Sequence, residues 1–144
     1  MIVQYAIDSL ELEEGIAIAQ KVRDYVDIIE LGEGMIQRYS LDSVTKLKEI
    51  FPEKKILADI KLMDAGYSLS LKAYNKGADI VTACAVATEG TARGIVKAAK
   101  EVGKESWLDL IAVPVEEYGK YVDYLNEIGP DYVCAHLSGD DSRD

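Results

Sequence analysis

Residues 57–66 read LADIKLMDAG, an apolar run whose second half is crowded with charge. The run begins with the composition of a buried β-strand, but Asp59, Lys61 and Asp64 follow one another within six residues. Burying a charge is unfavourable by several kcal/mol unless a partner compensates it. We therefore expect these charges either to be paired or to take part in chemistry.

Other short apolar runs occur before and after this one, and together they predict six strands. The predicted strands are residues 2–8, 26–31, 55–61, 79–85, 107–113 and 131–137. The segments between them carry apolar residues every three or four positions, which indicates amphipathic helices. Glycine follows the last periodic residue at Gly77, Gly103 and Gly129, as is typical of helix ends. The chain therefore alternates strand and helix five times and adds a sixth strand.

This alternation predicts a parallel sheet, because parallel neighbours need a crossover connection of a dozen or more residues. A doubly wound open sheet and part of a (β/α)8 barrel both satisfy it. No G-x-G-x-x-G or P-loop pattern is present, whereas ionisable residues stand at the carboxyl ends of the predicted strands. Those ends form the active-site face of a barrel. We predict one α/β domain over residues 1–144, an incomplete (β/α)8 TIM-type barrel of about six units.

The ionisable residues at the strand ends form the candidate site. The candidate catalytic residues are Asp8, Asp59, Lys61, Asp64, Asp109 and His136. Asp59 and Lys61 are two apart on one strand, so they are expected to share a face. Carboxylates, an ammonium and an imidazole gathered at one mouth would shift one another's pKa values toward neutrality. Glu30 and Asp59, from adjacent strands, could hold Mg²⁺, which prefers oxygen ligands.

Each candidate also has a purely structural interpretation. Asp8 could be a loop residue before a helix, and Asp59 with Lys61 could be an ion pair at a strand end. Asp109 could bond a neighbouring loop, and His136, the sole histidine, could be a hydrogen-bonded core residue. Taken singly, each residue favours structure over catalysis, because structural networks also perturb pKa values. Their coincidence at the ends of five strands favours a site.

Composition narrows the range of partners. The chain has 16 Lys and Arg against 26 Asp and Glu, a formal charge of −10. Nucleic acid and anionic membranes are therefore disfavoured, and a small molecule is the expected partner. Cys84 and Cys134 lie in apolar runs without a CxxC pattern, as expected of reduced packing residues. With no basic leader and no apolar run of membrane length, we expect a cytoplasmic protein without a membrane partner.

The run A-D-I-K-x-x-D-A-G at residues 58–66 resembles the D-x-K-x-x-D motif of the orotidine 5′-monophosphate decarboxylase superfamily. The form is the one used by 3-hexulose-6-phosphate synthase and 3-keto-L-gulonate-6-phosphate decarboxylase. Similar segments are YAID at 5–8, VDIIELGEG at 26–34, KGADIVT at 76–82 and DYVCAH at 131–136. The resemblance implies a Mg²⁺-dependent lyase acting on a sugar phosphate, with Glu30 and Asp59 at the metal and Lys61 as a charge partner. It further implies that His136 moves protons and that Asp64 reaches the partner's site in a homodimer.

The resemblance also implies a cis-enediolate intermediate, stabilised by Mg²⁺, that two reactions share. In the synthase, deprotonated ribulose 5-phosphate attacks formaldehyde, whereas in the decarboxylase the enediolate arises by loss of CO₂. Asp109 favours the synthase, because the decarboxylases tend to carry Glu there. The segment LSGDDSRD after His136 matches neither form.

Length leaves a further alternative open. A closed barrel needs roughly 200 residues, and its seventh and eighth units normally carry the phosphate-binding loops. Six strands alone would leave two sheet edges open. The chain could be a fragment of a longer protein, an inactive truncated product, or a subunit of an oligomer that closes the sheet. The alternative to a lyase is therefore a non-catalytic remnant that acts in assembly or binding.

Overall fold

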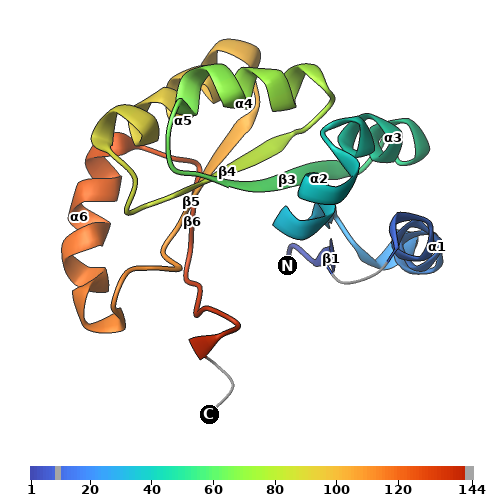
Figure 1. The fold of residues 1–144 in the computed structure, drawn as a ribbon, viewed down its shortest axis with the longest axis horizontal. Coiled ribbons are helices and arrows are strands. Elements are labelled where there is room, and N and C mark those ends of the chain that lie inside the picture. Colours follow the sequence, from blue (N-terminus) through green and yellow to red (C-terminus); the bar gives the residue numbers. More distant parts are fainter. Residues whose placement is uncertain (9–10, 142–144) are drawn as a thin grey trace. The chain divides into compact units, whose positions relative to one another are not determined.

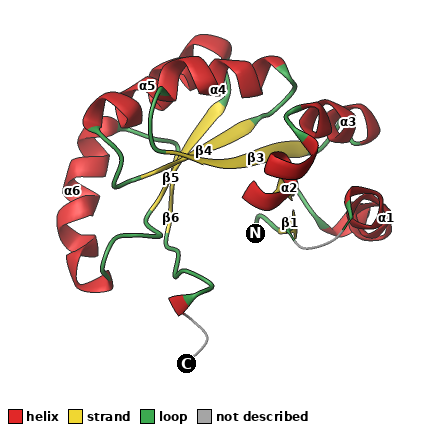
Figure 2. Cartoon of the chain, viewed as in Figure 1, coloured by secondary structure: helices red, strands yellow, loops and turns green. Residues whose placement is uncertain are grey.

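The computed structural model describes residues 1–8 and 11–141. Its strands are β1 (Gln4–Ile7), β2 (Ile28–Leu31), β3 (Lys55–Leu62), β4 (Ile80–Cys84), β5 (Glu105–Asp109) and β6 (Tyr132–Cys134). Its α-helices are α1 (Leu12–Val22), α2 (Glu33–Tyr39), α3 (Asp42–Ile50), α4 (Gly66–Asn75), α5 (Glu89–Val102) and α6 (Tyr118–Ile128). Short 3₁₀ turns, η1 (Arg23–Tyr25) and η2 (Val115–Glu117), extend α1 and precede α6. Figures 1 and 2 show strands alternating with helices along the chain.

The strands follow one another in the sheet in sequence order. Among the described residues the order is β1-β2-β3-β4-β5-β6, each hydrogen-bonded to the next. The pairs β1–β2, β2–β3 and β5–β6 are parallel. This order and these crossovers confirm the predicted α/β fold of an incomplete TIM-type barrel. No helix in the described part of the chain is long and apolar enough to cross a membrane.

The described chain divides into two compact units, and each is treated by itself below. Unit 1 comprises Met1–Ile60 and Lys72–Val81, and unit 2 comprises Lys61–Leu71 and Thr82–Asp144. β3, α4 and β4 therefore contribute residues to both units. The single domain expected over residues 1–144 stays a prediction.

Three local predictions differ from the structure. The strand expected at 107–113 begins earlier and ends at Asp109, because residues 111–112 form a turn, which the Val113 N–H closes by donating to the Leu110 carbonyl at 2.8 Å. Asp109 is thus the last residue of its strand. The strand expected at 131–137 ends at Cys134, so His136 lies two residues beyond β6. The helix α2 was not predicted. Only Met35 of its residues is buried, so it has no periodic apolar face.

In unit 1, α1 packs closely on β1. A Cβ added to Gly15 of α1 would lie 2.3 Å from Ile7 Cγ2. Ile7 is fully buried, and so are Ile29 of β2 and Ile56 of β3. Burying side chains of this size stabilises the folded state by about 1.5–3 kcal/mol each. The apolar runs of the sequence therefore become the strands of a packed core, as predicted.

An aspartate precedes each of β2, β4 and β6, and its carboxylate is hydrogen-bonded to backbone at the start of the neighbouring strand, β1, β3 or β5. The carboxylates of Asp27, Asp79 and Asp131 each accept a hydrogen bond from a backbone N–H there, at 2.8, 3.0 and 2.8 Å. Lys48 adds an ion pair to Asp79 at 2.8 Å. These carboxylates lie at the amino ends of strands, where barrel residues serve stability rather than catalysis. They are therefore not candidates for the site.

In unit 2, glycines end α5 and α6 as the sequence predicted. Gly103 and Gly129 have φ values of +65° and +74°, in the left-handed region that favours glycine. α5 and α6 lie to one side of β5 and β6 (Figure 1). The helix stops therefore return the chain to the next strand at the positions expected.

Gly66, the first residue of α4, allows a close approach to α5 within unit 2. A Cβ added to Gly66 would lie 2.2 Å from the backbone oxygen of Thr91. We expect Gly66→Ala to lower the free energy of unfolding by about 1–3 kcal/mol, because no rotamer change relieves a clash with backbone. Urea denaturation followed by circular dichroism measures this loss.

Gly119→Ala is the matched control for that substitution. Apart from its chain neighbours and the backbone of its own helix, no heavy atom of the described residues lies within 4 Å of the position that a Cβ on Gly119 would take in α6. Alanine favours a helix over glycine by about 0.5–1 kcal/mol, so the stability of Gly119→Ala should stay the same or rise. If Gly66→Ala were as stable as the wild type, the close approach of Gly66 to Thr91 would be wrong.

Candidate active site

Three predicted carboxylates share one face of unit 1. In the parallel register Ala6 lies opposite Glu30, and Glu30 lies opposite Leu57. Paired residues point to the same face, and so do residues two apart along a strand. Asp8, Glu30 and Asp59 are therefore on the same face of the sheet. Asp8 and Asp59 each follow, by two residues, the residue that is level with Glu30, so they lie nearer the carboxyl ends of the strands. Asp59 is only 6% exposed.

Asp8 follows β1 and contacts the residue that precedes α2. A Cβ added to Gly32 would lie 1.8 Å from Asp8 Oδ1, and the Gly32 N–H donates to the Ile7 carbonyl at 3.0 Å. Burial and then the negative charge of Asp8 raise the pKa of Tyr5 above its ordinary value. Glycine at position 32 therefore leaves room for the Asp8 carboxylate, and Tyr5 stays protonated at neutral pH.

Glu30 has a hydrogen-bond partner that sequence reasoning missed. Gln4 Nε2 donates to Glu30 Oε2, and the two residues are on the same face because Gln4 pairs with Ile28. A glutamine inside an apolar run gave no sign of this role. Only the register of β1 against β2 could have revealed it.

The two carboxylates predicted to bind Mg²⁺ fit that ion by their chemistry. Glu30 and Asp59 offer oxygen ligands from adjacent strands on one face, which suits Mg²⁺ better than zinc. Within residues 1–8 and 11–141, no three or more His, Cys, Asp or Glu side chains gather as a metal cluster. Two carboxylates supply only part of the ligand set of Mg²⁺, so an ion held there would need further oxygen ligands. The magnesium site stays a prediction.

In unit 2, Asp109 and His136 form a side-chain pair. Asp109 is 4% exposed and lies opposite Cys134, two residues before His136. Its Oδ2 is 2.8 Å from His136 Nδ1, and its Oδ1 accepts the Ile111 N–H at 2.8 Å. An ionised carboxylate can only accept hydrogen bonds, so we assign the proton to Nδ1. Nε2 is then the nitrogen that can accept a proton.

Lys61 and Asp64 lie around two unusual backbone conformations. The φ values of Lys61 and Ala65 are +49° and +53°, which are uncommon for residues other than glycine. Asp64 is exposed, and its Oδ1 accepts the Ala65 N–H at 2.7 Å. The rule that residues two apart share a face assumes extended backbone, so it does not extend from Asp59 through Lys61. Asp59 belongs to unit 1 and Lys61 to unit 2.

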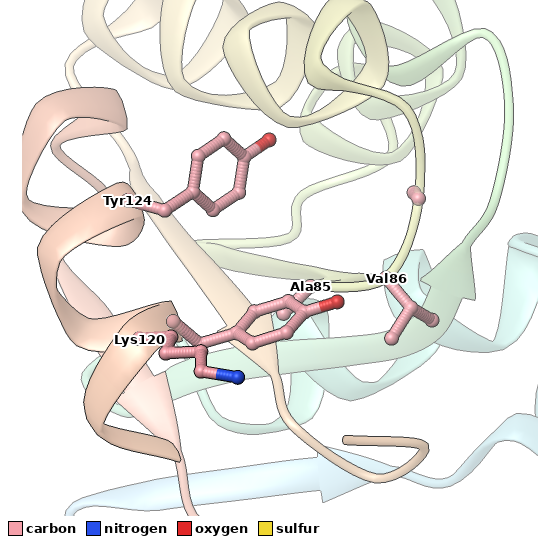
Figure 3. A pocket seen from close by; sticks show the side chains of 6 residues that line it. Ala85, Val86, Lys120 and Tyr124 are labelled. Atoms are coloured by element: carbon pink, nitrogen blue, oxygen red, sulfur yellow. The ribbon is translucent and has the colours of Figure 1, made fainter. Parts of the chain in front are cut away.

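Unit 2 also contains pockets. One of about 280 Å³ lies between the loop after β4 and α6, and is lined by Ala85, Val86, Ala87, Lys120, Tyr121 and Tyr124. In Figure 3, Lys120 and Tyr124 extend from the helix, and Ala85 and Val86 lie on the facing loop. Burial and then the charge of Glu89 raise the pKa of Tyr124, which keeps its hydroxyl protonated. A second pocket, of about 430 Å³, is lined by Asp64. Among the described residues that line these two pockets, Asp64 is the only predicted site residue.

Comparison with known proteins identifies the family. The model of the orotidine 5′-phosphate decarboxylase / HUMPS family matches residues 1–144. The chain belongs to this family. Membership confirms the resemblance that the D-x-K-x-x-D run implied. It does not by itself choose among the reactions within the family.

The chain is similar to proteins named 3-hexulose-6-phosphate synthase and to proteins named KGPDC. 3-Hexulose-6-phosphate synthase of Bacillus subtilis is 37% identical over 141 residues, which are 97% of this chain and 66% of that protein. A structure of 3-hexulose-6-phosphate synthase from Salmonella typhimurium matches with a TM-score of 0.93 and 37% identity, covering 98% and 66% of the two chains. A structure of KGPDC from Streptococcus mutans matches with a TM-score of 0.85 and 28% identity, covering 96% and 63%. The chain thus spans about two thirds of the length of these relatives.

Proposed function

We propose that this chain carries out the 3-hexulose-6-phosphate synthase reaction, the aldol addition of formaldehyde to ribulose 5-phosphate. The observation that carries the proposal is the 37% identity to a synthase of that name over 97% of the chain. KGPDC is less similar, at 28%. Asp109, the residue that favoured the synthase in the sequence, is paired with His136.

The reaction needs a proton to be moved at carbon. A proton leaves C1 of ribulose 5-phosphate, next to the ketone, and gives a cis-enediolate. C1 then forms a bond to the carbon of formaldehyde, whose oxygen takes up a proton. His136 suits proton movement, because Asp109 occupies Nδ1 and orients the ring while Nε2 can accept a proton.

Charge stabilisation is assigned to the residues around the D-x-K-x-x-D run. Glu30 and Asp59 would hold Mg²⁺, and the bound ion would supply positive charge to stabilise the negative charge of the enediolate. The Lys61 ammonium would add a second positive charge. We further propose that the protein works in the cytoplasm as a homodimer, in which Asp64 serves the partner's site.

The decarboxylation of 3-keto-L-gulonate 6-phosphate is the second candidate. The fold match to KGPDC, with a TM-score of 0.85, favours it. The two reactions share the enediolate and differ in whether it forms by loss of a proton or of CO₂. The same residues can serve both, so the substrate must be tested directly.

The test offers the purified chain both substrates in parallel. We expect formaldehyde to be consumed with ribulose 5-phosphate in the presence of Mg²⁺, and EDTA to stop the reaction until Mg²⁺ is returned. Release of CO₂ from 3-keto-L-gulonate 6-phosphate alone would favour the decarboxylase. No turnover of either substrate, with no binding of Mg²⁺, would favour the non-catalytic remnant. Light scattering on the same sample tests the homodimer.

A further inference from the structure

Lys61 has a backbone conformation that is uncommon for residues other than glycine. Its φ of +49° lies in the left-handed region, where Cβ crowds the following carbonyl oxygen. Such a residue persists only where its surroundings hold it, and such residues cluster at functional sites. The contacts that hold Lys61 are therefore part of how its side chain is directed.

Two side chains of β4 bind both backbone polar groups of Lys61. The Lys61 N–H donates to Thr82 Oγ1 at 3.0 Å, and its carbonyl oxygen accepts from Cys84 Sγ at 3.6 Å. Thr82 and Cys84 are 3% and 7% exposed and lie two apart on β4. All three residues belong to unit 2. We infer that Thr82 and Cys84 are positioning residues, which hold Lys61 in the left-handed conformation and so direct its side chain.

Packing alone does not explain the hydroxyl at position 82. Valine has nearly the same shape as threonine and would fill the buried space without needing a hydrogen-bond partner. The hydroxyl instead accepts the N–H of the residue with the unusual φ. A thiol is a weak donor, so Thr82 supplies the larger part of the restraint and Cys84 the smaller.

The catalytic consequence rests on the proposed function, in which the Lys61 ammonium stabilises the reacting substrate. The φ of a residue sets the direction of its Cα–Cβ bond relative to the preceding chain. If Lys61 relaxed to an extended conformation, its ammonium would be carried away from its working position. A misplacement of about 1 Å can lower a rate about a hundredfold.

Amide hydrogen exchange tests the restraint without reference to activity. Thr82→Val removes the acceptor and keeps the shape, and Thr82→Ser restores the hydroxyl. We expect the Lys61 amide to exchange about tenfold faster in Thr82→Val, and at close to the wild-type rate in Thr82→Ser. Thr45→Val is the matched control, because it removes a hydroxyl that donates to the Lys76 carbonyl in unit 1. It should leave the exchange of Lys61 unchanged.

Kinetics tests the consequence for catalysis. Thr82→Val should lower kcat about tenfold or more and leave KM within about twofold of the wild type. Thr82→Ser should restore kcat. If the hydroxyl served stability alone, Thr82→Val would lower the free energy of unfolding and leave kcat of the folded fraction unchanged.

The outcomes separate this inference from the function on which it rests. Unchanged exchange of the Lys61 amide in Thr82→Val overturns the inference, whatever the activity. Faster exchange with a wild-type kcat overturns its catalytic part. A wild-type chain that turns over neither substrate overturns the proposed function, and the exchange rates then decide the positioning of Lys61 by themselves.

Discussion

Asp59→Asn is expected to abolish the synthase reaction, with turnover of ribulose 5-phosphate and formaldehyde falling at least about a thousandfold. Asp59 is 6% exposed, and we propose that its carboxylate holds Mg²⁺ together with Glu30. Asparagine keeps the size of the side chain but removes the negative charge that favours a hard divalent cation. Circular dichroism should show a folded chain, because asparagine has nearly the same size as aspartate and opens no cavity at this buried position.

Metal binding separates this prediction from other causes of inactivity. Electron paramagnetic resonance of added Mn²⁺, which prefers the same oxygen ligands as Mg²⁺, measures binding without turnover. Asp59→Asn should weaken it, and Asp123→Asn, which changes an exposed aspartate of α6, should not. Wild-type turnover or wild-type Mn²⁺ affinity in Asp59→Asn would remove Asp59 from the proposed metal site.

The strands could be predicted because burial leaves a direct mark on composition. Every residue of β4, Ile80–Cys84, is buried, and its sequence IVTAC carries no charge. The helix ends were equally visible, since Gly103 and Gly129 adopt the left-handed conformation that glycine favours. α2 could not be predicted in the same way. It buries only Met35, and one buried residue gives no helical period.

The site was predicted as a set of residues, but not as a set of contacts. Asp109 and His136 were both candidates, yet their pairing depends on the register that sets Asp109 opposite Cys134. The role of Gln4 likewise follows from the register of β1 and β2. Registers are set by tertiary packing across the sheet, which the pattern of a single strand does not contain.

Lys61 marks a different limit of sequence reasoning. A left-handed backbone conformation can be expected from the sequence where glycine, asparagine or aspartate occurs, because these residues favour it. Lysine has no such preference, so the sequence did not indicate the conformation of Lys61. Thr82 and Cys84 were uninformative for the same reason, because both fit an ordinary buried strand. The local strain at Lys61 and its two contacts on β4 become visible only in the folded chain. Such departures from local preference are expected at functional sites.

Asp109→Asn is expected to lower turnover about a hundred- to ten-thousandfold by changing the tautomer of His136. Asp109 Oδ2 now accepts from Nδ1 at 2.8 Å, which leaves Nε2 able to take a proton. The Asn amide can present its NH₂ group to Nδ1 and move the ring proton to Nε2. A residue that moves protons through Nε2 would then carry the wrong tautomer.

The sole histidine of the chain makes this measurable by ¹⁵N NMR without assignment ambiguity. At a pH where the ring is neutral, the wild type should show the proton on Nδ1, and Asp109→Asn should shift it toward Nε2. His136→Gln should lose activity to a similar extent, and the double variant little more, because the two residues act as one unit. Asp140→Asn is the matched control. Asp140 is exposed, and its backbone N–H, which the substitution keeps, donates to Ser138 Oγ. Additive losses in the double variant, or an unchanged tautomer in Asp109→Asn, would show that Asp109 does not act through His136.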